Sequence, residues 1–333
     1  MTLPDRAPPR KPSRLGLYGP FVLLLIVLAA WSAYWIWARG KLEQRVDRGA
    51  ASLRAAGFEV AWTSRRIYGF PFRLDLDFAN LRLREASGWA LAAPLLKCEA
   101  WAYTPGHWIA VASQGVTFTR PSGGGVSVGG QALRASLSAL GESPPRLSVE
   151  GLNLTFTPAP GARPFFAQTA RELHLHTRAG PDDQGAVYFS LEGVAADPSG
   201  VIGRIADGKP VSIEADAIFS HASALSGHDW PGMVRAWSRA GGALRVRQAT
   251  IQAGEALLDA RTGDISVGED GRLHGRLTAS LRDAPRAVSI LGGGPAAELV
   301  AGAVTAAPLT IQFENGRTEL GVVPVAGAPK VFP

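Results

Sequence analysis

The stretch GFPFRLDLDFANLRLRE, residues 69–85, alternates between apolar and polar side chains. A period of two residues is typical of a β-strand with one buried face and one solvated face. The alternation slips at Ala79 and Asn80 and then resumes, which indicates a bend, a bulge or a tight turn. The charged face, with Arg73, Asp75 and Asp77, is expected to be the solvated one. If no protein covers the other face, the candidate lipid-facing residues are Phe72, Leu74, Leu76, Phe78, Leu81 and Leu83.

The composition of the whole chain favours the same kind of structure. Its 333 residues include 39 glycines and 24 prolines spread along the chain, which suits many short strands joined by turns. Because the strands leave no room for crossover helices, they predict an antiparallel meander, and the few helical segments leave much of it uncovered. We therefore expect an all-β, mainly antiparallel fold, either a long curved sheet or a β-sandwich-like body with few helices, preceded by one N-terminal transmembrane helix.

An uncharged, apolar run occupies residues 15–38, between Arg14 and Arg39. As a helix it would be about 36 Å long, enough to span a hydrocarbon core of about 30 Å with some tilt. No small-x-small cleavage site follows it, so the run predicts an uncleaved anchor and not a signal peptide. Aromatic residues at its ends are expected at the membrane–water interfaces. These candidate anchor residues are Tyr18, Trp31, Tyr34, Trp35 and Trp37.

The charges that flank this run are nearly balanced and do not decide its orientation. The formal net charge of the chain is +6, with much of the excess near the N-terminus, which favours a membrane surface over nucleic acid as the partner. A short basic tail usually stays inside, whereas a large C-terminal domain crosses with little regard to charge. We therefore expect a single-pass protein of the inner membrane with its large domain in the periplasm.

The patterns divide the chain into five parts. Residues 1–14 predict a disordered basic tail, 15–38 the transmembrane helix, 39–56 an amphipathic helix, 57–226 an antiparallel β-sheet region, and 227–333 a short helix followed by a C-terminal β-sheet region. The amphipathic helix is expected to continue from the transmembrane helix or to hinge with it. The short helix, residues 228–239, has Asp229 as its start signal. Residues 284–307 are predicted to be partly helical.

Few residues carry a chemical signal. His174 and His176 share a strand face but lack an identifiable third ligand, so they predict no metal site. Cys98 is the only cysteine and is expected to be a small buried hydrophobe. Arg65 and Arg66 lie beside aromatic residues and are candidates for binding a lipid headgroup at the interface, against the alternative of ordinary surface arginines. We expect no catalytic residue, no cofactor and no enzymatic activity.

Three segments carry a resemblance to a known family. The anchor, the passage GFEVAWTSRRIYGFPFRLDLDFANLRL at residues 57–83 and the closing LTIQFENGRTELGVVPV resemble the alphaproteobacterial family called domain of unknown function 2125 (DUF2125). The likeness covers nearly the whole chain after residue 15 and brings no catalytic residues with it. Residues 243–283 are also similar to the repeating strands of AsmA-like envelope proteins. That resemblance implies an extended β structure that conducts or organises lipid between two bacterial membranes.

The anchor, the alternating strands and the shortage of helices together predict a function. We expect a membrane-anchored envelope protein that binds, shields or helps deliver a lipid or another apolar envelope component along an apolar sheet face. The alternative is an envelope scaffold or assembly factor with a filled core that binds another protein. Membrane lipid is thus the expected partner, while envelope proteins and the oligomeric state are left open and no nucleic acid is expected.

Overall fold

One antiparallel sheet dominates the structure. The computed structural model describes residues 15–226, 229–282, 290, 308–321 and 323–332. Among these residues, 18 strands form a single sheet in which every pairing is antiparallel. The predicted all-β, mainly antiparallel fold is therefore confirmed.

The elements follow one another along the chain with short connections. The helices are α1 (Leu15–Ala55), α2 (Val201–Ala206) and α3 (Trp230–Arg239), with a 3-10 turn η1 (Ala222–Ala224). The first nine strands are β1 (Glu59–Ala61), β2 (Ser64–Tyr68), β3 (Arg73–Arg84), β4 (Ala90–Trp101), β5 (Trp108–Val111), β6 (Val116–Arg120), β7 (Gly124–Gly129), β8 (Ala132–Ser138) and β9 (Arg146–Pro158). The others are β10 (Ala167–Ala179), β11 (Gly185–Ala196), β12 (Val211–Phe219), β13 (Leu244–Ala253), β14 (Ala256–Val267), β15 (Leu273–Arg282), β16 (Leu309–Glu314), β17 (Arg317–Leu320) and β18 (Val323–Gly327).

Chain order and spatial order nearly coincide in this sheet. From β9 to β18 each strand pairs with the next one along the chain. Before β9, pairs of short strands share one position in the sheet. Thus β1 and β2 both pair with β3, β5 and β6 both pair with β4, and β7 and β8 both pair with β9. The predicted meander is confirmed, because short turns can join only antiparallel neighbours.

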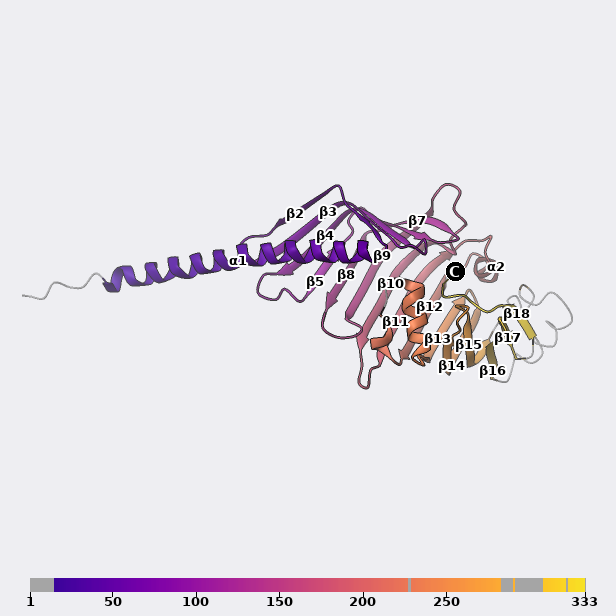
Figure 1. Cartoon of the computed structure of the whole chain (residues 1–333). Helices are drawn as coiled ribbons and strands as arrows, with labels where there is room; N and C mark the ends of the chain where they lie inside the picture. Colours follow the sequence, from indigo (N-terminus) through magenta and orange to yellow (C-terminus); the bar gives the residue numbers. More distant parts are fainter. Residues whose placement is uncertain (1–14, 227–228, 283–289, 291–307, 322, 333) are drawn as a thin grey trace, which may run out of the picture.

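The predicted transmembrane and amphipathic helices form one continuous helix, α1. Its first part is exposed and projects away from the sheet, and the helix is long and apolar enough to cross a membrane (Figure 1). From Trp31 onward it lies across β2–β5 and packs on the sheet. The contacting residues recur every three or four positions, which places them on one face of the helix. They are Trp31, Trp35, Ala38, Leu42 and Val46.

Asn80 explains the slip in the alternation of β3. Its backbone lies in the left-handed region, with φ of 52°, inside a strand that continues to Arg84. Asparagine tolerates this conformation better than most residues, and its side-chain amide donates to Thr63 Oγ1 at 3.1 Å. Beyond Asn80, Leu81 joins the same cluster as Leu76 and Phe78. The slip is therefore a bend within one strand.

The segment that follows β3 contacts α3, which follows β12 in the chain. The carboxylate of Glu85, which follows β3, accepts a hydrogen bond from the backbone N–H of Trp230 at the start of α3. In Figure 1, α3 lies in front of β12 and β13. The carboxylate of Asp229 accepts from the Gly232 N–H at 2.6 Å, so the predicted start of this helix is confirmed. The helix expected in residues 284–307 lies almost wholly outside the described residues.

Candidate functional site

The apolar face of the opening stretch is covered by protein. Leu74, Leu76 and Phe78 are 1%, 5% and 9% exposed, and they pack against α1. The expectation that these three side chains line an open lipid-binding face is therefore corrected. The sequence did not show that the apolar face of α1 packs on β3. Leu81 and Leu83 are half-buried, and only Phe72, at the tip of the stretch, is largely exposed among the six candidates.

The aromatic residues at the end of the membrane segment bond to the sheet domain. Trp31 Nε1 donates to the Pro71 carbonyl and Trp35 Nε1 to the Arg73 carbonyl, both at 2.8 Å. The Tyr34 hydroxyl donates to the Ala102 carbonyl, also at 2.8 Å. These side chains thus fasten α1 to two loops of the domain. The other two candidate anchor residues, Tyr18 and Trp37, are exposed on the helix.

Arg65 is committed to α1. Its guanidinium pairs with Asp47 at 2.5 Å and with Glu43 at 3.2 Å, and the arginine side chain is only 14% exposed. Hydrogen bonding to Arg65 lowers the pKa of Asp47, and the same bond raises the pKa of Arg65. This pairing corrects the expectation that Arg65 is open to a lipid headgroup. Arg66 points to the opposite side of β2, where it is exposed and lies over the ring of Tyr68 at 5.2 Å.

The charged side of β3 is less solvated than the alternation predicts. Asp75 is only 7% exposed, and Arg73 pairs with it at 2.9 Å and with Glu99 at 2.6 Å. Hydrogen bonding to Asp75 raises the pKa of Arg73. The Asp77 carboxylate accepts a hydrogen bond from the Tyr68 hydroxyl at 3.1 Å. Around Asp75 the expected solvated exterior is thus a partly buried ion pair, because the Asp75 side chain is 9% exposed and that of Arg73 is 42% exposed.

The registers of the sheet align apolar residues from strand to strand. Cross-strand partners project to the same face, so a chain of partners marks one row across the sheet. We call one such chain the central row. Its members, from β2 to β16, are Ile67, Leu76, Cys98, Ala110, Ala135, Val149, Leu175, Phe189, Ala215, Ala249, Ala260, Ala279 and Leu309. Every side chain in this row is apolar.

Two further rows flank the central row on the same face. One flanking row consists of Leu133, Gly151, Leu173, Leu191, Ile213, Ile251, Leu258 and Leu281. The other consists of Trp108, Leu137, Leu147, Thr177, Val187, Ala217, Val246, Gly263, Leu277, Ile311 and Leu320. Only Thr177 interrupts them with a hydroxyl. The three rows together form a broad apolar face, which we call the apolar band.

The opposite face of the same strands is polar. The row beside the central row on that face consists of Asp77, Lys97, Val111, Arg134, Glu150, His174, Ser190, Glu214, Thr250, Asp259 and Ser280. Ion pairs such as Arg134–Glu150, at 2.5 Å, connect its neighbours. The two faces of these strands differ in character: the rows on one are almost entirely apolar, and the row on the other is mainly polar or charged. The sheet is therefore amphipathic, with one polar face and one apolar face.

The helices cover only parts of the apolar band. Near β2–β5 the cover is α1, and Ala206 of α2 and Trp237 of α3 belong to clusters over the later strands. Between them, the central-row residues from Ala110 on β5 to Ala249 on β13 remain half-buried. A single sheet whose middle apolar residues keep part of their surface open differs from a filled two-layer core.

A hollow of about 340 Å³ lies on the apolar band beside α2. Ile202 and Ile205 of α2 form one side, and Ile251, Leu258 and Phe313 are among the sheet residues that line it. Its lining is almost entirely aliphatic, so an acyl or other hydrocarbon group fits its chemistry. None of these residues was singled out from the sequence, although the alternation of their strands could have found them.

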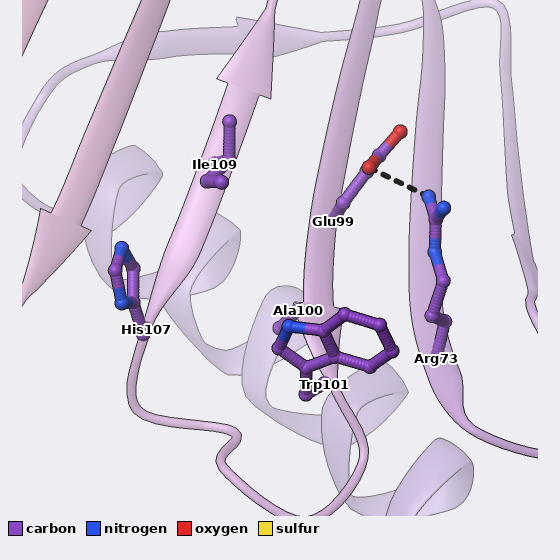
Figure 2. Close-up of a pocket in the computed structure, with 6 residues that line it drawn as sticks. All are labelled: Arg73, Glu99, Ala100, Trp101, His107 and Ile109. Atoms are coloured by element: carbon purple, nitrogen blue, oxygen red, sulfur yellow. Dashed lines mark ion pairs between the residues drawn. The ribbon is translucent and has the colours of Figure 1, made fainter.

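A smaller hollow of about 170 Å³ lies at the other end of the sheet, near the loops that α1 fastens (Figure 2). Arg73, Glu99, Trp101 and His107 line it, with the Arg73–Glu99 ion pair across its rim. Cys98 lies on the opposite, apolar face of β4, and burial raises the pKa of its thiol to about 11. His174 and His176 stack with ring centroids 6.0 Å apart. Within the described residues, no group of three or more histidine, cysteine or acidic side chains could hold a metal ion.

Comparison with known proteins gives the family of this chain. Neither curated proteins nor solved structures gave a match. Residues 35–329 match the model of a family described as "Uncharacterized protein conserved in bacteria (DUF2125)". This match begins within the aromatic end of the membrane segment and includes the whole sheet. The chain therefore belongs to the DUF2125 family.

Proposed function

We propose that this chain is a membrane-anchored envelope protein that binds a lipid, or another apolar envelope component, along the apolar band and helps to deliver it away from the membrane. The observation that carries the proposal is the central row, an unbroken chain of apolar cross-strand partners from Ile67 on β2 to Leu309 on β16. The role is binding and not catalysis.

The direction of the central row supports transport along it. The row runs across the strands, and its first members lie beneath α1, in one cluster with Leu42 and Val46, which follow the apolar run of the helix. Neighbouring strands are about 4.8 Å apart, so the part from β8 to β16 extends over roughly 40 Å. One acyl chain spans about 15 Å, half of a hydrocarbon core of about 30 Å. The band is therefore long enough to shield an acyl chain at several successive positions.

Small residues in the central row support an apolar occupant. Ala215, Ala249, Ala260 and Ala279 follow one another on β12–β15; the first two are half-buried, and the last two are only 2% and 3% exposed. The row beside them holds larger branched residues, Ile213, Ile251, Leu258 and Leu281 on the same strands. At Ala215 and Ala249, whose surface is partly open, small side chains beside larger ones leave room for a narrow hydrocarbon chain. We place the anchor in the inner membrane and the sheet domain in the periplasm, where a shielded lipid would have to cross water.

Photo-crosslinking from neighbouring positions on β11 tests this proposal. Phe189 belongs to the central row, whereas Tyr188 lies on the polar face, where its hydroxyl donates to Glu214 Oε1 at 3.3 Å. Both side chains are half-buried aromatics, so benzoylphenylalanine replaces each with a similar change in size. In cells that produce the full chain, we expect lipid adducts from position 189 and none from position 188, detected by mass spectrometry.

The alternative outcomes separate lipid binding from scaffolding. Equal lipid labelling from positions 188 and 189 would mean non-specific contact and would contradict the proposal. Reproducible adducts with one protein, and none with lipid, from position 189 would favour an envelope scaffold or assembly factor. The Tyr188 variant is the matched control for expression, membrane insertion and irradiation.

A further inference from the structure

Two loops of the sheet domain lie beside the end of the membrane segment. Residues 69–72 join β2 to β3, and residues 102–107 join β4 to β5. Trp31 of α1 holds the first loop through the Pro71 carbonyl, and Tyr34 holds the second through the Ala102 carbonyl, each at 2.8 Å. Both loops are therefore fixed at the level of residues 31–34 of the helix.

The charge pattern of α1 places that level at the membrane surface. No charged residue lies between Arg14 and Arg39. A hydrocarbon core of about 30 Å takes about 20 residues of helix, so a core that begins near Leu15 ends near Trp35. The two loops then meet the bilayer where its interface begins.

The loops and the ends of their strands expose large aromatic side chains at this level. Phe70 and Phe72 are 56% and 59% exposed, and Trp101 and Tyr103 are 51% and 59% exposed. The rings of Trp101 and Tyr103 stack, with centroids 5.5 Å apart. Aromatic side chains are favoured at the membrane interface, where their apolar part leaves water and their polar part stays hydrated.

Charges close to these aromatic residues are paired. The sequences GFPF at residues 69–72 and WAYTPGH at residues 101–107 contain no aspartate, glutamate, lysine or arginine. At the base of the loops Arg73 forms ion pairs with Asp75 and Glu99, and Figure 2 shows the pair with Glu99. Pairing reduces the cost of bringing charges close to a medium of low dielectric constant. Residues 69–72 and 101–107 therefore carry no acidic, lysine or arginine side chain whose desolvation would oppose insertion into the interface.

We propose that these two loops form a second membrane contact, in which Phe70, Phe72, Trp101 and Tyr103 insert into the interface of the bilayer that α1 crosses. The occupant of this aromatic surface is the bilayer beside the helix. Together with α1, the loops hold the first strands of the sheet against the membrane and fix the tilt of the domain. This inference needs α1 to cross a membrane, but it does not need the apolar band to bind lipid.

Site-specific fluorescence in reconstituted membranes tests the contact. In a full chain carrying Cys98→Ser, single cysteines are introduced by Phe70→Cys and Tyr103→Cys and labelled with nitrobenzoxadiazole. The labelled chains are inserted into vesicles of palmitoyl-oleoyl phosphatidylcholine that contain a lipid with a nitroxide near the top of its acyl chain. We expect a blue shift of the emission and loss of intensity at both positions.

Two controls make the result decisive. Trp37→Cys, on the exposed side of α1, should be quenched and shows that the helix has inserted. Glu269→Cys, in the exposed turn between β14 and β15, should emit as in water. Water-like, unquenched emission from positions 70 and 103 beside a quenched position 37 overturns the proposal. If Cys98→Ser does not fold, the same labels are introduced with Cys98 in place, and the unsubstituted chain supplies the background.

Discussion

Trp35 donates its indole N–H to the backbone carbonyl of Arg73 at 2.8 Å and so joins α1 to the first residue of β3. Its ring is only 6% exposed and meets Phe70 edge to face, with centroids 5.4 Å apart. The end of the long apolar run of α1 is therefore part of the hydrophobic core of the sheet domain. No flexible linker separates the domain from this helix, so packing sets the position of the domain relative to the helix.

Trp35→Phe should loosen this junction. It leaves the Arg73 carbonyl without its donor, and an unsatisfied buried polar group costs about 1–3 kcal/mol. We expect the free energy of unfolding, measured with denaturant in detergent micelles, to fall by that amount. Trp37→Phe is the matched control, because Trp37 is 58% exposed, and it should change stability little. Equal effects of the two substitutions would contradict the assigned role of Trp35.

The pair of Asp47 and Arg65 should make the packing of α1 sensitive to acid. Hydrogen bonding to Arg65 lowers the pKa of Asp47 in the folded protein. Its stabilising contribution is therefore fully present above the ordinary aspartate value of about 3.9, and it is lost as the pH falls through the lower folded value. We expect pepsin to cleave near the α1–β1 junction only when the pH falls into that lower range. Asp47→Asn should allow cleavage at higher pH, whereas Glu59→Gln, at an exposed carboxylate on β1, should not.

Cys98 should be unreactive in the folded protein. Burial raises the pKa of its thiol to about 11, so the thiol stays protonated at neutral pH. Any stabilisation linked to the neutral thiol is present below the ordinary pKa of about 8.5 and is lost as the pH rises through about 11. We expect slow alkylation by iodoacetamide in the native state and fast alkylation after unfolding in urea. Fast native-state labelling at neutral pH would show that the thiol is open to solvent.

The backbone conformation of Asn80 should matter more than its side chain. A β-branched residue in the left-handed region costs roughly 1–2 kcal/mol, so Asn80→Val should destabilise the protein by about that much. Asn80→Gly keeps the conformation and loses only the hydrogen bond to Thr63 Oγ1, and it should cost less. Denaturant unfolding of both variants measures the difference. If glycine were as harmful as valine, the hydrogen bond and not the bend would be the important feature.

A carboxylate in the central row should block lipid binding. Ala215 lies in that row, and Ser212, on the same strand, lies on the polar face; both are half-buried. Burying a charge beside an acyl chain is costly, so Ala215→Asp should lower the lipid that copurifies with the full chain by roughly tenfold, which is about 1.4 kcal/mol. Ser212→Asp should leave the amount unchanged. Mass spectrometry of extracted lipid measures both, and equal retention would argue against binding at this row.

Local sequence patterns predicted much of the fold. The charge-free run predicted the helix that can cross a membrane, strict alternation predicted β3, and Asp229 predicted the start of α3. The candidate site was predicted less well. Leu74 and its neighbours were assigned to an open face, and Arg65 to a headgroup, although both are covered by α1. Alternation says that a face is apolar, but it does not say whether lipid or a helix lies on it.

The sequence by itself determined the helices and strands of this protein. The length of an uncharged run, the spacing of apolar residues and the helix-capping residues are all local features, which depend on residues close together in the chain. Only the tertiary structure decided which elements cover one another and how the rows form. The central row exists because a dozen successive pairings keep one register, and bends such as that at Asn80 adjust which residues share a face. Register depends on partners distant in the chain, such as Phe189 and Ala215 or Ala260 and Ala279. No local pattern contains that information, and it is what makes one side of the sheet continuously apolar.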